Sequence, residues 1–120
     1  MADNTPIYPP TSSEFSEERR NLAPKPAEAF KAFSQSVFAD GAVSAQTKQL
    51  IAVAVAHVTQ CPYCIIGHTK GALKHGASPE QIMEAIWVAA EMRAGAAHAH
   101  SVLAMEAIAH TRKERSRSEK

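Results

Sequence analysis

The segment that begins at Ser78 restricts the possible folds of this chain more than any other. Ser78 suits the N-cap of a helix, Pro79 suits the first helical position, and Gln81 stands where a capping box needs it. Residues 82–90 are apolar on most sides of a helix, and the short stretch 94–97 reads Ala-Gly-Ala-Ala. A helix that is apolar all round must be buried all round. We therefore predict a long helix to about residue 110.

This long helix is expected to be either the central rod of the domain or part of a subunit interface. The chain has 120 residues, which leaves room for one modest core, and much of its apolar content is alanine. Single cores of this size are only marginally stable, and small residues let another helix approach closely. We therefore favour the interface and expect a homo-oligomer.

The rest of the chain also has the spacing of helices. Ser44 is a plausible N-cap, Pro62 suits a first helical position, and Gly76 suits a left-handed C-terminal residue. The run 47–59 is rich in valine and isoleucine but is long for a strand and lacks glycine and proline, which favours a helix. We expect these further helices at about 13–21, 26–38, 44–59 and 61–75.

The predicted fold class is all-α, with a single helical domain over residues 26–110. The proline-bearing residues 1–25 are expected to form an N-terminal arm. Residues 111–120 are almost wholly charged or polar, so we expect a charged, disordered tail there.

Charge and hydropathy point away from nucleic acid and membranes as partners. The formal net charge is only +1, which gives no general attraction to polyanions. The start of the chain is polar, unlike a signal peptide. The longest clean apolar run, residues 50–56, is far shorter than the ~20 residues of a membrane span. We expect a cytoplasmic protein with no nucleic acid partner and no membrane partner.

The chemistry of the chain is concentrated in Cys61-Pro62-Tyr63-Cys64 and His68. The two cysteines are the only ones present, and His68 follows the second by four residues. Residues three and four apart share a face of a helix, so two thiols and an imidazole can meet. A cysteine at the N-cap has its thiolate stabilised by the helix dipole, which favours Cys61 as the more acidic thiol. Such a pair can cycle between dithiol and disulfide.

Other interpretations of the motif stay open. Two ordinary buried cysteines are one. A structural zinc site is another, with Cys61, Cys64 and His68 as three ligands and a fourth from His57, His98 or His100. Zinc sites usually combine a CxxC with a second ligand pair, and His98 and His100 face different ways on a helix, so we expect no metal and no other cofactor.

The stretch Lys48–Ala56, the motif from Cys61 to His68, and the continuation Lys74–Ser78 together resemble the alkylhydroperoxidase D-like (AhpD-like) core of the carboxymuconolactone decarboxylase superfamily. The resemblance extends over roughly residues 26–110. It implies an all-helical fold assembled into homo-oligomers, commonly trimers or hexamers. It also implies reduction of a hydroperoxide or disulfide exchange, with a dihydrolipoyl-bearing protein or thioredoxin as the thiol electron donor. The decarboxylase branch lacks the dithiol, so that activity is disfavoured.

The resemblance also assigns roles to residues. It implies that Cys64 attacks the peroxide, that Cys61 resolves the product to a disulfide, and that His68 belongs to a proton relay. The family usually has a glutamate twelve residues before the first cysteine, where this chain has Gln49. Glutamine accepts a hydrogen bond but cannot accept a proton at ordinary pH. This difference supports an alternative function, a redox adaptor or sensor with little peroxidase turnover. Either Glu84 or Glu91 could supply the missing carboxylate.

Overall fold

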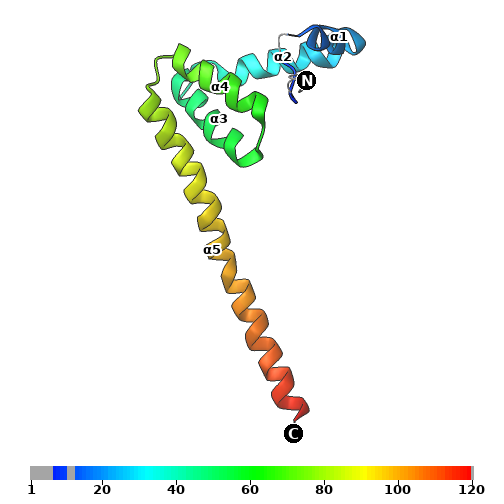
Figure 1. The fold of residues 1–120 in the computed structure, drawn as a ribbon, viewed down its shortest axis with the longest axis vertical. Helices are drawn as coiled ribbons and strands as arrows, with labels where there is room; N and C mark the ends of the chain where they lie inside the picture. The colour runs from blue at the N-terminus through cyan, green and yellow to red at the C-terminus, as the bar shows by residue number, and fades with distance from the viewer. Residues whose placement is uncertain (1–6, 11–12, 120) are drawn as a thin grey trace, which may run out of the picture.

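The computed structural model describes residues 7–10 and 13–119, and over these it contains helices and no strand. The all-α fold class predicted from the sequence is confirmed (Figure 1). The helices, with their bounds, are α1 (Glu14–Leu22), α2 (Pro24–Phe38), α3 (Ala45–Thr59), α4 (Pro62–Lys74) and α5 (Pro79–Ser118).

Side-chain caps fix the starts of α3 and α5, as the sequence indicated. The Ser44 hydroxyl accepts the N–H of Thr47 at 3.2 Å, and the Asp40 carboxylate accepts the N–H of Ala45 at 2.7 Å. At α5 the capping box is complete, because the Ser78 hydroxyl accepts the N–H of Gln81 at 3.1 Å and the Gln81 side chain accepts the N–H of Ser78 at 2.8 Å. These bonds satisfy donors that a helix start otherwise leaves unpaired.

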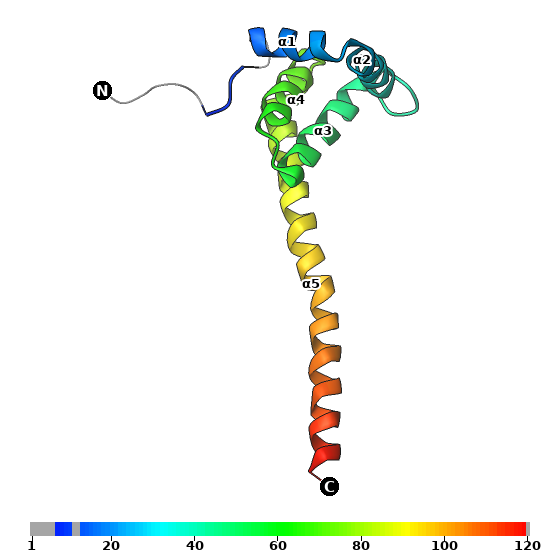
Figure 2. The same cartoon turned by 90° about the vertical axis from the view of Figure 1, so that its right-hand side faces the viewer.

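Helices α3 and α4 form an antiparallel pair, and the first part of α5 packs against α3 (Figure 2). The Gln46 side chain of α3 donates to the carbonyl of His75, just past α4, at 2.9 Å. The core between these helices is small, and Val53 of α3 is its only large side chain that is completely buried. Its buried members are Val53, Ala72, Ala77 and Ile82, with Leu50 and Ile86 packed against them.

Helix α2 lies across one end of this three-helix unit and packs loosely against α3, and among the described helices α1 packs only against α2 (Figure 1). The predicted helix at 13–21 lies within one residue of the observed α1. Helix α2 begins at Pro24, two residues before the predicted Pro26, because proline is tolerated in the first turn of a helix. The part of the expected arm that covers residues 1–6 and 11–12 lies outside the described residues.

Helix α5 is 40 residues long and continues to Ser118, which corrects the expectation of a disordered tail from residue 111. The tail contains no glycine or proline and is rich in arginine, lysine and glutamate, which have high helix propensity. The His110 imidazole and the Glu114 carboxylate, one turn apart, approach to 3.3 Å.

The all-round burial expected for α5 is not achieved within one chain. Trp87 is 69 % exposed, and Leu103 further along is 63 % exposed. The Cα radius of gyration is 22.2 Å, whereas a compact chain of this length has about 14 Å. No helix in the described part of the chain combines the length and the apolar character that crossing a bilayer requires.

Candidate active site

The dithiol lies at the junction of α3 and α4. Gln60 ends α3 in a left-handed conformation, with φ 59°, which turns the chain sharply toward α4. Cys61 then takes the N-cap position and Pro62 the first helical position, as predicted. The Cys61 sulfur accepts the backbone N–H of Cys64 at 3.3 Å, so it serves as the side-chain cap of α4. The helix start therefore places one thiol where unpaired N–H groups gather.

The two thiols are free and differ in acidity. A hydrogen bond from the Cys64 thiol, helped by the backbone N–H groups of Cys64 and Tyr63, lowers the pKa of the Cys61 thiol. The same sulfur–sulfur hydrogen bond, then burial and repulsion by the Cys61 charge, raises the pKa of the Cys64 thiol. Both directions follow from one arrangement, in which Cys61 is the more acidic of the two thiols. The helix-dipole argument from the sequence thus agrees with this geometry.

His68 lies one turn beyond Cys64 and is held by two neighbours. Its Nδ1 lies 2.8 Å from Oε1 of Gln49 on α3. An amide oxygen only accepts, so in this arrangement Nδ1 carries the hydrogen and Nε2 is free to take a proton. The ring of Phe38, at the end of α2, stacks on the imidazole with 5.0 Å between centroids. These contacts fix both the tautomer and the plane of the ring.

Gly71 makes the room for this hydrogen bond. A Cβ at that position would lie 2.6 Å from Oε1 and 2.8 Å from Cδ of Gln49. Atoms at these distances would overlap, so the side chain of Gln49 can cross to His68 only because residue 71 has none.

Two cavities open onto the same pair of groups, Cys64 and His68. The first, of about 380 Å³, lies along α3 and is mostly apolar. The second, of about 480 Å³, is more polar and includes Gln49, Tyr63 and Ser34 in its lining. Phe38 lines both cavities, whereas Cys61 lines neither. Cys64 is therefore the sulfur that a molecule in either cavity meets.

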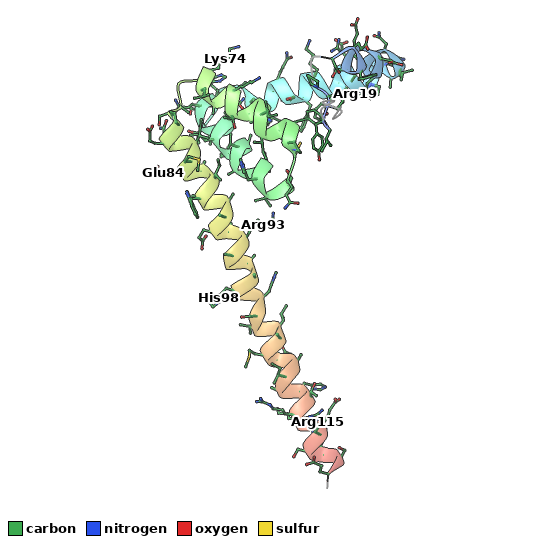
Figure 3. The ribbon with its side chains drawn as sticks, in the orientation of Figure 1. Arg19, Lys74, Glu84, Arg93, His98 and Arg115 are labelled. Atoms are coloured by element: carbon green, nitrogen blue, oxygen red, sulfur yellow. The ribbon has the colours of Figure 1, made fainter. Side chains whose placement is uncertain are left out.

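The structure brings Cys61, Cys64, His68 and Gln49 together, but it leaves out the carboxylates that the sequence suggested. Glu84 and Glu91 are exposed on α5 and line neither cavity. In Figure 3 the labelled side chains of Glu84, Arg93 and His98 mark the course of α5 away from the α3–α4 pair.

The other histidines have roles outside the thiol pair. The His57 imidazole is hydrogen-bonded at 2.7 Å to the carbonyl of Val53 in its own helix. His98 and His100 are exposed on α5. Among the described residues, no three histidine, cysteine, aspartate or glutamate side chains come close enough together to hold a metal ion.

Sequence reasoning missed three contributors to the site: Phe38, Lys48 and Gly71. Lys48 appeared only as part of the segment that resembles the AhpD-like core. The position of Gly71, three residues after His68 on the same helix, was the signal that could have found it. Tyr63 is partly exposed, and its ring packs edge-on against Tyr8 with 5.8 Å between centroids.

Comparison with known proteins agrees with this description. A protein of Paracoccus denitrificans, "Uncharacterized protein 4 in cox locus", is 69% identical over 81 residues, which are 68% of this chain and 73% of that protein. An uncharacterized protein of Cupriavidus necator is 39% identical over 67 residues, or 56% of this chain and 59% of the relative.

Solved structures share the arrangement. A carboxymuconolactone decarboxylase family protein from Legionella pneumophila superposes with a TM-score of 0.61 at 34% identity, over 63% of this chain and 68% of the other. A protein from Methanobacterium thermoautotrophicum superposes with a TM-score of 0.65 at 34% identity, over 69% and 93% of the two chains. The model of the carboxymuconolactone decarboxylase family matches residues 24–107. The chain therefore belongs to the carboxymuconolactone decarboxylase family, which includes the AhpD-like proteins.

Proposed function

We propose that this protein is a thiol-dependent hydroperoxide reductase with an antioxidant role, which uses Cys61 and Cys64 as a redox-active dithiol. One observation carries the proposal: the two cysteines lie together at the start of α4, where the Cys61 sulfur accepts the N–H of Cys64, and Cys64 shares two open cavities with an oriented imidazole. Family membership supports the same chemistry, because the family includes AhpD-like peroxidases.

In the proposed reaction the Cys64 thiol gives its proton to Nε2 of His68, and the thiolate attacks one oxygen of the hydroperoxide. The O–O bond breaks, the leaving oxygen takes the proton and departs as an alcohol, and Cys64 is oxidised to a sulfenic acid. The Cys61 thiolate then attacks the Cys64 sulfur, and the hydroxyl leaves as water after taking from the solvent the proton that Cys61 released when its thiolate formed. One hydroperoxide and two thiols thus give one alcohol, one water and one disulfide.

Access and acidity select different cysteines for these two steps. Cys64 lines both cavities and neighbours His68, which suits the thiol that meets the substrate. Cys61 has the lowered pKa, so it forms the thiolate nucleophile more readily than Cys64 does. We therefore assign the attack on the peroxide to Cys64 and the resolving step to Cys61.

A second dithiol must return two electrons and two protons to the disulfide in each cycle. We propose a dihydrolipoyl-bearing protein or a thioredoxin-like protein as this donor, because either can reach a disulfide at an exposed helix start. Continuous reduction of this kind suits the cytoplasm, where thiol systems keep cysteines reduced.

We further propose that the working form is a homo-oligomer, a trimer or a hexamer. The exposed apolar side chains of α5, among them Trp87 and Leu103, and the open shape of the single chain support this assembly. A second copy would bury the helix sides that one chain leaves in solvent.

Mass spectrometry of cysteine variants after peroxide treatment tests the function. The unaltered protein should form a disulfide between Cys61 and Cys64. Cys61→Ser should accumulate a sulfenic acid on Cys64, and Cys64→Ser should lose turnover with a dithiol donor. The proposal fails if peroxide leaves both thiols free in the folded protein, and a sulfenic acid found on Cys61 would reverse the assignment of roles.

Gln49 supports a second candidate, a redox adaptor or sensor that exchanges disulfides with a partner and turns over peroxide slowly. The amide orients His68 but cannot take up the proton that a glutamate could accept. Gln49→Glu should therefore raise the rate of peroxide turnover if the native protein is an adaptor. No increase, with rapid turnover by the native protein, would argue against the adaptor.

A further inference from the structure

The apolar cavity carries a single formal charge. Its lining along α3 consists of Ile51, Ala52, Val55 and Ala56, with Lys48 at one end and Thr59 at the other. These residues share one face of the helix and extend over about 16 Å. Hydrogen peroxide needs no apolar groove of this length, so the cavity suits a substrate with a carbon chain.

Lys48 is held at its end of the cavity. Its ammonium donates to the carbonyl of Ala39, the residue after α2, in a contact of 2.6 Å. An ammonium has three donors, so two remain for another acceptor. Lys48 is thus anchored at the turn between α2 and α3, and it lines the same cavity as Phe38 and His68.

The charge of Lys48 has no acidic partner in the described part of the chain. The nearest carboxylate in sequence, that of Asp40, accepts the N–H of Ala45 and makes no ion pair with Lys48. A cation fixed without a counter-charge at the edge of an apolar cavity is suited to bind an anionic group of a ligand.

The position of Cys64 relative to Lys48 sets where the reactive group of such a ligand lies. Gln49 of α3 contacts His68 of α4, and the carbonyl of Ala56 accepts the N–H of Cys61 at the start of α4. Because the two helices are antiparallel, Cys64 lies alongside the part of α3 between these two contacts. Lys48 is then about one and a half turns of α3 from the level of Cys64, and the cavity continues past Cys64 toward Thr59. The hydroperoxide would lie within the chain of the ligand.

We propose that this cavity binds a hydroperoxide that bears a carboxylate, such as that of an unsaturated fatty acid, with Lys48 on the carboxylate and the carbon chain along α3. The inference rests on the proposed reductase function for its chemistry. It adds the substrate class and a residue that determines specificity.

A fatty-acid hydroperoxide and its methyl ester test this proposal, because the two differ only in the negative charge. The native protein should have a kcat/KM about fivefold higher for the acid than for the ester, as expected for one partly exposed ion pair. Added salt should reduce this ratio, since it screens the pair. Lys48→Gln should bring the ratio to about one, and Lys48→Arg should keep the preference for the acid.

Lys74→Gln is the matched control, because it removes the same charge from the far end of α4, outside both cavities (Figure 3). It should leave the ratio at its native value. Equal rates with acid and ester in the native protein, or a preference that survives in Lys48→Gln, would overturn the proposal while the reductase function stands.

Calorimetric titration with the unoxidised fatty acid and its methyl ester separates binding from turnover. The acid should bind more tightly than the ester, and only Lys48→Gln should remove the difference. If no hydroperoxide oxidises the thiols, the reductase function fails, and this titration still decides whether Lys48 binds the carboxylate.

Discussion

Thiol chemistry at this site requires a sulfur that ionises readily and a sulfur that a substrate can reach. These two properties belong to different cysteines. Cys61 has the favourable electrostatics, because its sulfur accepts hydrogen bonds from the Cys64 thiol and from the first turn of α4. Cys64 has the access, because it lines both cavities next to His68. Neither property alone identifies the sulfur that reacts with a substrate, so the two have to be measured separately.

The difference in acidity predicts different pH profiles of alkylation for the two thiols. Since the pKa of Cys61 is lowered and that of Cys64 is raised, thiolate at Cys61 should form at lower pH. Iodoacetamide should label Cys61 with a midpoint below that of an ordinary cysteine, and Cys64 with a midpoint above it. Peptide mapping in the Cys61→Ser and Cys64→Ser variants checks each thiol without its partner, where both midpoints should move back toward the ordinary value.

Gly71→Ala should break the hydrogen bond between Gln49 and His68. The added Cβ would overlap the amide of Gln49, which must move away, so His68 should lose its protected Nδ1–H signal in NMR spectra. The control is Gly67→Ala on the same helix, where a Cβ meets no atom within 4 Å. That variant should gain about 0.5–1 kcal/mol of unfolding free energy and keep the signal. A retained Nδ1–H signal in Gly71→Ala would contradict the role given to this glycine.

Among the helices and turns, the turns before and after α4 differ in how well their residues suit a left-handed backbone conformation. Gln60 has φ 59° without being glycine, whereas Gly76 has φ 88° at the end of α4. The left-handed region is unfavourable for residues with a Cβ. The turn that leads into Cys61 is therefore held in place by its surroundings, including the bond from the Cys61 N–H to the carbonyl of Ala56.

Substitutions at these two turns should have opposite effects on stability. Gln60→Gly should raise the unfolding free energy by about 0.5–1 kcal/mol, because glycine adopts the left-handed region without strain. Gly76→Ala should lower it by about 1 kcal/mol for the converse reason. Urea unfolding followed by circular dichroism measures both. A loss of stability in Gln60→Gly would mean that its side chain contributes more than the backbone strain costs.

The helix boundaries show which structural features a sequence specifies locally. Ser44, Ser78 and Gly76 were assigned correctly because caps and left-handed residues depend on neighbours within one turn. The end of α5 was placed too early, because a solvated run of charged residues has no apolar pattern that marks it as a helix. The high helix propensity of the arginine, lysine and glutamate residues in this run keeps it helical.

The site was predictable to the extent that it lies on one element. Cys61, Cys64 and His68 follow from spacing along α4, and Gln49 was found through the resemblance. Phe38, Lys48 and Gly71 owe their roles to contacts between α2, α3 and α4, which spacing along one helix cannot reveal.

The whole molecule, as a single chain, buries only a small part of its apolar side chains. Its buried side chains are mostly alanines, while exposed apolar groups follow α5 for most of its length. A 40-residue helix is about 60 Å long, and only its first part packs against α3. The fold of one chain therefore explains the position of the site but leaves the outer half of α5 without a partner.

A charge placed on the outer half of α5 should disrupt the proposed oligomer. In light scattering, the native protein should have a mass that is a multiple of the chain mass. Leu103→Glu should reduce this mass, because burying a carboxylate among apolar side chains is strongly unfavourable. Thr111→Glu adds the same charge at an already polar position and should leave the mass unchanged. A native protein that is monomeric at all concentrations would refute the assembly.

The cap at the start of α4 also bears on the reduction potential of the thiol pair. As a thiolate, the Cys61 sulfur is a charged acceptor for the N–H of Cys64, whereas within a disulfide it would be neutral and a weaker acceptor. The helix end therefore favours the reduced state, and by the thermodynamic cycle it makes the oxidised state easier to reduce. The electron affinity of this centre is thus set in part by the backbone of the helix on which it lies.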